Sequence, residues 1–489
     1  MQRQEAWMGT RRAVLGAIGL GILVTGFDPV RRSWATDGGN VDPLPPLDGQ
    51  VLLDAPSREG VSQDAGRYVQ KVPQAVLVPG SVRDIQAMIR YCVKNRVPVA
   101  PRGLANTTDG QGLVSGLLIE MRALRKVHRI EADRAVVDAG ADWLELTNAA
   151  HAKGLTPPAL TGFLGLTFGG TLSLGGIPPA IQSGGQVDSV LELEVVTGTG
   201  ELKRCSKTQD RELFEAVLAG LGQYAIITKA TVKLGPTPAK VRGHELAYTS
   251  SKDFFTDFKT LIKRGEISEI YGDWWRPGEH GEVSHLNAFT FHSVAKPPND
   301  AQILRGLTKS PADAVVSAND FLPHVTRIDA AVEQLREALD WDHLAKPWMT
   351  LWLPEKSVEQ YVTEVVTKLT PSDVGAGGFV LLYAHRRTKL TRPSLRLPAP
   401  DGSDWVYLFT LMTAGAAGAG PEFAAEMLKR NRRLFDRARA LGATRYPIES
   451  TPFTTPDWQH HYGNRWPLLQ KLKRQHDPAG ILTPGPGMF

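Results

Sequence analysis

The chain has 489 residues, of which 42% are hydrophobic and 22% are charged. These are ordinary values for a globular protein and exclude a largely disordered chain, and at roughly 150 residues per domain the length predicts two or three folding units. The net charge is +5, but residues 1–35 contribute +3, and the remaining +2 is too little to indicate a nucleic-acid partner. Because two cysteines form neither a disulfide framework nor a zinc site, we expect Cys92 and Cys205 to be buried packing residues.

The N-terminus carries a pattern typical of export. Thr10-Arg11-Arg12 precedes an apolar run over 13–26, and small residues surround Ala35. Residues 1–35 therefore resemble a twin-arginine signal cleaved after Ala35, which predicts a periplasmic or secreted protein with no stable membrane insertion after cleavage. An uncleaved anchor is the alternative, although the run is short and rich in glycine for a membrane span. Residues 36–64 are polar and rich in Pro and Gly, so we expect a lead-in segment and no core element.

Strands and helices alternate from residue 65 onward. A buried strand over 75–79, a helix that begins after Ser81 and a strand over 97–100 form one unit. That unit ends in the polar, glycine-containing loop 102–111, and α/β folds bind ligands at such strand ends. The same patterns predict strands at 116–121, 134–139, 190–196, 202–205 and 225–234, and helices at 143–153 and 210–218.

The stretch 160–176, LTGFLGLTFGGTLSLGG, combines glycines with hydroxyl side chains. Glycines let the backbone approach a ligand closely. The spacing matches neither the nucleoside-triphosphate loop nor the dinucleotide fingerprint. Backbone amides and hydroxyls could still hold a pyrophosphate. A purely structural turn is the alternative.

Residues 239–440 differ in character and contain clusters of aromatic residues. Strand-like runs at 379–383 and 407–412 alternate with amphipathic helices at 257–264, 328–339, 358–369 and 422–441. This pattern predicts an antiparallel sheet with helices packed on it. In the C-terminal tail, His460 and His461 are neighbours, and on a strand such neighbours point apart. With no matching third ligand, we expect no metal site.

Several segments resemble the cytokinin dehydrogenases, flavoproteins whose FAD domain is of the vanillyl-alcohol-oxidase (PCMH) type. The segments are RGLANTTDGQ, LTFGGTLSLGGI, VLELEVVTGTGE, LFEAVLAGLGQYAIITKA, DFLPHVTRID, KPWMTLWLP and the ending DPAGILTPGPGMF. The resemblance implies an α+β fold in which a two-part FAD-binding domain, 65–238 and 441–489, carries an inserted antiparallel α+β cap, 239–440. The implied activity is transfer of a hydride from a CH–NH or CH–OH carbon of a small substrate to FAD, with reoxidation by oxygen or a diffusible electron acceptor.

The resemblance also implies which residues contact FAD, mostly through backbone amides. Carried over position by position, they are Gly103, Leu104, Ala105, Asn106, Thr107, Gln111, Gly162, Thr167, Ser173, Ile177, Ile227 and Tyr446.

Three positions depart from the family pattern. Asn106 stands where the family has the histidine that bonds covalently to the flavin, which predicts noncovalent FAD. Gly162 stands where the family has the aspartate that accepts a proton from the substrate amine, and glycine has no side chain to act as a base. Pro486 replaces a glutamine that contacts the cofactor.

Another residue must therefore supply the base, unless the substrate needs none. The candidates, chosen because their segments are expected near the flavin, are Asp109, Asp273, His385, Glu449 and His461. Overall similarity favours N6-alkyl adenine substrates, whereas the missing aspartate favours an alcohol, an aldehyde or a secondary metabolite. A degenerate flavoprotein that binds a ligand without turnover and a flavin-free binding protein are the alternatives.

Overall fold

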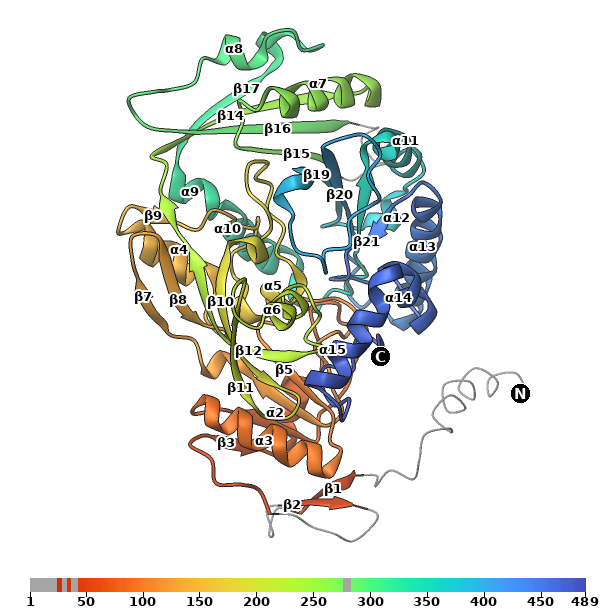
Figure 1. Ribbon diagram of the computed structural model, residues 1–489. Helices are drawn as coiled ribbons and strands as arrows, with labels where there is room; N and C mark the ends of the chain where they lie inside the picture. Colours follow the sequence, from red (N-terminus) through yellow and green to blue (C-terminus); the bar gives the residue numbers. More distant parts are fainter. Residues whose placement is uncertain (1–23, 29–32, 37–42, 276–282) are drawn as a thin grey trace, which may run out of the picture.

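The computed structural model describes residues 24–28, 33–36, 43–275 and 283–489 (Figure 1). The predicted α+β class is confirmed, since helices accompany several separate sheets. The twin-arginine motif lies outside the described residues. Of the predicted signal, the structure describes only β1 (Val24–Asp28) and part of β2 (Ser33–Thr36), which pair antiparallel. Within the described ranges, no helix is both long and apolar enough to cross a membrane.

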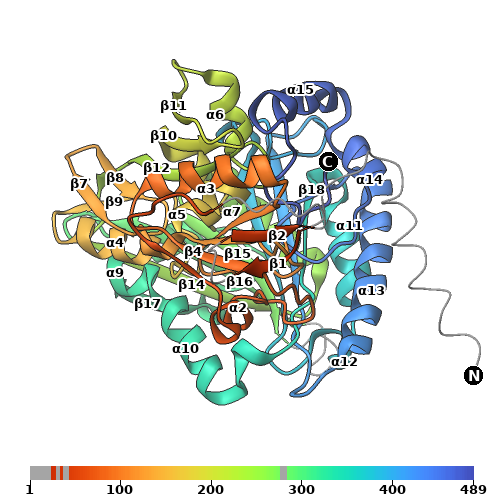
Figure 2. The same ribbon diagram turned by 90° about the horizontal axis from the view of Figure 1, so that it is seen from below.

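A four-stranded sheet forms the lower end of the molecule in Figure 1, and Figure 2 shows this end face-on from below. Its strand order is β3-β4-β6-β5, and β6 pairs in parallel with both neighbours. α3 connects β4 to β5 and buries Ile85, Met88, Ile89 and Cys92 at helical spacing. The elements are β3 (Gln50–Leu52), α2 (Ala55–Gly60), β4 (Ala75–Val78), α3 (Val82–Asn95), β5 (Val99–Arg102) and β6 (Leu117–Glu120).

The segment over residues 36–64, expected to be a lead-in without a core element, contributes a strand and a helix to the fold. β3 lies within it and pairs antiparallel with β4, so this segment forms one edge of the sheet. α2 follows, and the Asp54 carboxylate caps it by accepting the Ser57 N–H at 2.9 Å. Pattern reading missed β3 because three residues are too few to show alternation.

A five-stranded antiparallel sheet follows, in the order β11-β10-β12-β8-β7. Both cysteines are free and buried, Cys92 in α3 and Cys205 in β11, as predicted. The elements are β7 (Val127–Ile130), β8 (Arg134–Asp138), α4 (Trp143–His151), β10 (Val190–Thr197), β11 (Leu202–Ser206), α6 (Arg211–Val217) and β12 (Ala225–Lys233). Two further short strands, β9 (Leu155–Thr156) after α4 and β13 (Gly235–Pro236) after β12, pair with each other in an antiparallel sheet of their own.

The glycine-rich stretch is partly helical. α5 (Phe168–Leu174) begins after Thr167, whose side chain accepts the N–H of Gly170 at 3.4 Å. Phe168 and Leu172 are fully buried, and the Phe168 ring packs 4.0 Å from the ring centroid of Trp143. Tertiary packing therefore overrides the low helix propensity of two consecutive glycines.

The region 239–440 builds an eight-stranded sheet in the order β17-β14-β16-β15-β19-β20-β18-β21, and every neighbouring pair is antiparallel. The last strand, β21, lies beyond residue 440. The strands are β14 (Lys240–Tyr248), β15 (Glu269–Trp275), β16 (Ser284–His292), β17 (Val315–Asp320), β18 (Met349–Pro354), β19 (Phe379–Arg386), β20 (Trp405–Met412) and β21 (Thr444–Arg445).

The two faces of this sheet have different neighbours. Leu382 and Phe409 point into an apolar core with α7 (Ser251–Arg264), α11 (Glu355–Val366) and α13 (Pro421–Ala440) (Figure 1). Since successive strand residues alternate between faces, Leu381 and Tyr383 lie on the other face. The remaining helices of this region are α8 (Asp300–Leu304), α9 (Phe321–Val325), α10 (Arg327–Leu339) and α12 (Pro371–Val374).

The C-terminal segment returns to the first sheet. After α14 (Thr455–Tyr462) and α15 (Trp466–His476), the Val99 N–H donates to the Ile481 carbonyl at 2.8 Å. The Thr483 N–H donates back to the Val99 carbonyl at 2.8 Å. The expectation that His460 and His461 lie on a strand is wrong, because both belong to α14. Among the described residues, no group of three or more His, Cys, Asp or Glu is placed to hold a metal ion.

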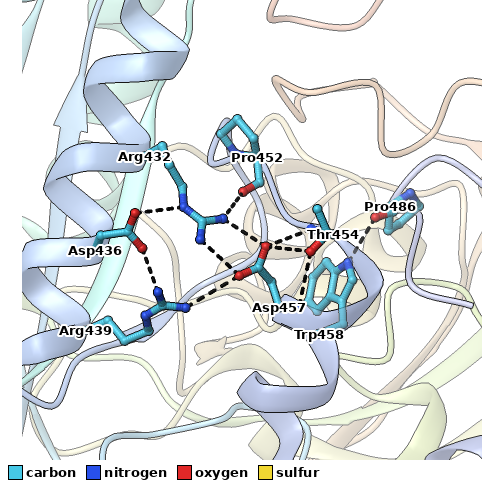
Figure 3. A network of polar contacts seen from close by, with 8 residues as sticks. All are labelled: Arg432, Asp436, Arg439, Pro452, Thr454, Asp457, Trp458 and Pro486. Carbon is cyan, nitrogen blue, oxygen red and sulfur yellow. Dashed lines mark hydrogen bonds and ion pairs between the residues drawn. The ribbon is translucent and has the colours of Figure 1, made fainter. Parts of the chain in front are cut away.

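An ionic network joins α13 to α14 (Figure 3). Both carboxylate oxygens of Asp457 accept from the Arg432 guanidinium, at 2.9 and 3.1 Å. In the next residue, the Trp458 indole N–H donates to the Pro486 carbonyl at 3.2 Å. Position 486, where the resembled family has a polar side chain, therefore contributes through its backbone, and the network connects the eight-stranded sheet to the C-terminal segment.

Asp457→Asn should lower the free energy of unfolding by about 1–3 kcal/mol, because Arg432 then loses a half-buried ionic partner. Burial raises the pKa of Asp457, but the bonds from Arg432 and Thr454 outweigh it and the net pKa is lowered. The contribution is therefore fully present at neutral pH, begins to fall once the pH drops below about 4, and is lost completely only as the pH passes the lowered pKa. Chemical denaturation at pH 7 and pH 3 measures it. Glu426→Gln is the matched control, since its ion pair with Arg433 is exposed and should contribute less than about 0.5 kcal/mol.

Candidate functional site

One cavity lies between two parts of the molecule. On one side are the segments that follow the four-stranded and five-stranded sheets, and on the other is the face of the eight-stranded sheet that α7, α11 and α13 do not cover. It encloses about 1600 Å³ outside protein atoms, part of which is open to solvent. One wall is formed by the loop after β5, by α5 with its flanking residues and by the start of β12. The opposite wall carries side chains from β18, β19 and β20 together with the segment after β21.

The loop after β5 follows the cavity wall in a strained conformation. Residues 103–107 all line the cavity, and Ala105 has a left-handed φ of 48°. A non-glycine residue adopts this conformation at a cost of order 1 kcal/mol, and such strain clusters at ligand-binding sites. The Asn106 side chain makes no hydrogen bond with another described residue.

The end of α5 is fixed by contacts between distant segments. The Gly176 N–H donates to the Tyr446 hydroxyl at 3.1 Å, and the Gly176 carbonyl accepts from the Gln186 N–H at 2.7 Å. Gly176 has φ of 62°, and a Cβ built there would lie 2.0 Å from the Gln186 side-chain oxygen. Only glycine fits, so the backbone itself forms the cavity surface here.

The predicted cofactor contacts converge on this cavity. All of them line it except Gly162, whose neighbour Thr161 does. Gln111 is already partly engaged, because its side-chain oxygen accepts the Asp109 N–H at 2.9 Å and its amide N–H donates to the Glu449 carbonyl at 3.4 Å. That these residues contact FAD stays a prediction, but eleven of the twelve line this one cavity.

Most of the predicted base candidates lie off the wall. Asp109 accepts from the Tyr68 hydroxyl at 3.2 Å, and Asp273 accepts from the Asn287 amide at 2.8 Å. Burial lowers the pKa of His385 to about 3 and that of His461 to about 3, the latter with a contribution from Arg445. Imidazoles with such pKa values are weak bases at neutral pH.

Glu449 is the exception, since it lines the cavity. Its carboxylate accepts from the Thr350 hydroxyl, which lies 3.0 Å from the Thr410 hydroxyl on the neighbouring strand. Both threonines also line the cavity. Burial raises the pKa of Glu449 to about 8, although Thr350 and the Arg445 charge act in the lowering direction.

Asp64 is a second carboxyl group on the wall, and sequence analysis missed it. Burial raises its pKa to about 7 despite N–H donors from Gly110 and Gly66. It lies in the expected lead-in segment, which gave no pattern signal. Thr350 and Thr410 were also missed, although the β18–β20 register places them opposite each other.

Gly162 and Tyr383 face each other beside the cavity. A Cβ built at Gly162 would lie 3.6 Å from the Tyr383 hydroxyl and 3.9 Å from Ile328, which is ordinary contact. The Asp329 carboxylate fixes this segment by accepting the N–H of Gly165 at 2.8 Å and of Leu164 at 3.1 Å. The Tyr383 hydroxyl lines the cavity and makes no hydrogen bond to another described residue.

These features fit FAD. A dinucleotide needs close backbone contact along its pyrophosphate, and the glycine-rich wall with its left-handed residues provides it. The flavin ring needs a largely apolar slot, and the opposite wall offers Leu381, Leu408 and Met412.

Comparison with known families defines the class of protein. A model of an FAD binding domain matches residues 73–206, and the model described as "Cytokinin dehydrogenase 1, FAD and cytokinin binding" matches residues 300–489. Together they cover the two sides of the cavity, so the chain is an FAD-dependent oxidoreductase.

Individual relatives narrow this class. The chain is 31% identical to the "Uncharacterized oxidoreductase ORF5 in fasciation locus" of Rhodococcoides fascians over 425 residues, covering 86% of this chain and 95% of that protein. It is 30% identical to cytokinin dehydrogenase 3 of Oryza sativa subsp. japonica over 492 residues, covering 91% and 92%. Cytokinin dehydrogenase 1 of Arabidopsis thaliana is 27% identical over 482 residues, covering 91% and 83%. The chain therefore belongs to the cytokinin dehydrogenase-like family.

Gly176→Ala should reduce the FAD content of the purified protein several-fold, because a Cβ both strains the backbone and collides with Gln186, whose N–H holds the Gly176 carbonyl. The ratio of flavin absorbance to protein absorbance measures this content. Gly154→Ala is the matched control: its φ is 71°, but nothing lies within 4 Å of the added Cβ. That variant should lose about 1 kcal/mol of stability and keep its flavin. Equal flavin content in the two variants would contradict the assignment of this wall.

Proposed function

We propose that the chain is an exported, periplasmic or secreted, oxidoreductase that takes a hydride from a CH–NH or CH–OH carbon of a small molecule, with FAD bound noncovalently. Oxygen or a diffusible acceptor reoxidises the cofactor. Export rests on the residues around Arg11 and Arg12 alone. When bound, FAD supplies the hydride acceptor, and the protein positions the substrate carbon and removes a proton.

The observation that carries the substrate assignment is the Gly162–Tyr383 pair. A side chain at position 162 would begin 3.6 Å from the Tyr383 hydroxyl, which lines the cavity, whereas glycine places no acid or base there. Burial raises the pKa of Tyr383, so its hydroxyl is neutral at pH 7 and cannot accept a proton as a carboxylate does. This supports a substrate other than an N6-alkyl adenine, such as an alcohol, an aldehyde or a secondary metabolite.

Anaerobic addition of isopentenyladenine should leave the flavin absorbance of the wild-type protein unchanged, while a member of an alcohol and amine panel bleaches it. Gly162→Asp should make isopentenyladenine bleach the band, because a Cβ fits at this position in ordinary contact and a general base contributes 10²–10⁴-fold. Gly162→Asn is the matched control, since it adds the same volume without a base.

Two results would change this proposal. Rapid bleaching of the wild-type protein by isopentenyladenine would mean that a cytokinin is oxidised with a base elsewhere. A flavin spectrum that shifts on ligand addition but is bleached by no compound would favour the alternative, a degenerate flavoprotein that binds without turnover.

Acid precipitation should release all the flavin into the supernatant, because the Asn106 amide cannot form the bond that a histidine makes to the flavin. Absorbance of the pellet and the supernatant measures the distribution. Flavin retained in the pellet would show a covalent link through another residue and would contradict the noncovalent assignment.

A further inference from the structure

Two carboxyl groups line the cavity, and their hydrogen bonds differ. In Asp64, one oxygen accepts the Gly66 N–H at 3.0 Å, and the other accepts the Gly110 N–H at 2.7 Å and the Thr107 hydroxyl at 3.2 Å. Both oxygens of Asp64 are therefore engaged by the protein, and the group serves to hold the surrounding loops.

Only one of the two carboxyl oxygens of Glu449 is hydrogen-bonded to a described residue. Oε2 accepts from the Thr350 hydroxyl, while Oε1 makes no hydrogen bond to any described residue. The residue is only 7% exposed, and it lines the cavity. Oε1 is not fully buried, and because the residue lines the cavity, this unpaired oxygen is accessible from it. Oε1 is thus available to a bound molecule.

The backbone of Glu449 is held from two sides. Its carbonyl accepts from the Arg445 guanidinium at 2.8 Å and from the Gln111 amide at 3.4 Å. Gln111 belongs to the wall that carries most of the predicted cofactor contacts, whereas Thr350 and Tyr446 belong to the opposite wall. Glu449 therefore lies at the junction between the cofactor wall and the substrate side of the cavity.

We infer that Glu449 is the catalytic proton acceptor of this site, taking the O–H or N–H proton of the substrate through Oε1. The inference rests on the proposed function and names the base that Gly162 cannot supply. The groups that face Glu449 are Thr350 from β18, Thr410 from β20, Arg445 from β21 and Tyr446. Arg445 and Tyr446 are the titratable ones, and both remain protonated between pH 8 and pH 9, where Glu449 ionises, since burial lowers the pKa of Arg445 only to about 10 and raises that of Tyr446.

The reaction balances with FAD as the oxidant. The substrate C–H bond breaks and its hydride, with both electrons, passes to FAD. The X–H bond of the same substrate, where X is O or N, breaks and its proton passes to the Glu449 carboxylate. A C=X double bond forms, so the carbon is oxidised and FAD is reduced by two electrons. Reoxidation by the acceptor returns the site to its starting state once Glu449 loses the proton.

A proton acceptor of this kind must gain a proton when the cofactor is reduced. The pKa of Glu449 is about 8, so above that pH the carboxylate is ionised in the oxidised protein. Negative charge on the reduced cofactor nearby then favours protonation of Glu449. A carboxyl group with a merely structural role would keep its protonation state.

The test is a reductive titration of the FAD-loaded protein, which needs no substrate. Between pH 8 and pH 9 the wild-type midpoint potential should fall by about 59 mV per pH unit, because two protons accompany two electrons and each proton is a tenfold factor, or about 29.6 mV. In Glu449→Gln the slope of the midpoint potential against pH should halve, because only the proton taken up by the cofactor then accompanies the two electrons. Glu269→Gln, a buried carboxyl group that does not line the cavity, is the matched control and should keep the wild-type slope.

Thr350→Val provides a second variant if Glu449→Gln loses its flavin. Removing the hydroxyl that lowers the pKa of Glu449 should move the break in the potential–pH curve to higher pH. A wild-type protein that takes up one proton would overturn the inference, and so would a second proton that disappears in Asp64→Asn but stays in Glu449→Gln. Either result leaves the oxidoreductase proposal standing if the flavin is bound and a substrate reduces it, whereas a colourless folded protein would overturn both.

Discussion

The structure depends on close approach of the backbone to the cavity along one wall. Ala105, Leu221 and Thr483 line this wall in left-handed conformations that side chains rarely adopt. Each costs of order 1 kcal/mol and persists only because contacts around it fix the backbone. Thr483 shows how: its N–H and its carbonyl are bound by Val99 and by the Gln223 amide, at 2.8 and 2.7 Å. The cavity wall therefore exists only when the first sheet and the C-terminal segment are joined.

The opposite wall follows from strand alternation in the eight-stranded sheet. Leu382 and Phe409 are buried beneath helices, so Leu381, Tyr383 and Thr410 necessarily face the cavity. The same alternation gives this wall its mixed chemistry, because Thr410 shares its face of β20 with Leu408 and Met412 and lies opposite both Leu381 and Thr350. One sheet thus serves as the core of its own domain and as one surface of the site.

The sequence predicts the binding segments correctly where the residues that form them are contiguous. The loop 102–111 and the stretch 160–176 were identified by glycines and hydroxyls, and both line the cavity. For the catalytic base, only one of the five predicted candidates, Glu449, lines the cavity. Asp109 and Asp273 occur in suitable segments, but local hydrogen bonds hold them away from the wall. Among the described residues, neither His385 nor His461 forms an ion pair, and burial, which only packing confers, lowers the pKa of both.

The sequence by itself determined the α+β class, the family and the glycine-rich wall, because these depend on residue type and local spacing. The resemblance also predicts that Asn106 and Gly162 replace the flavin-linking histidine and the catalytic aspartate. Only the tertiary structure decided that Glu449 meets Thr350 across 99 positions of chain, that Tyr383 faces Gly162, and that β3 and Asp64 in the expected lead-in reach the first sheet and the cavity. The reason is physical: the pKa and reach of a side chain are set by burial and by neighbours distant in sequence, which no local pattern records.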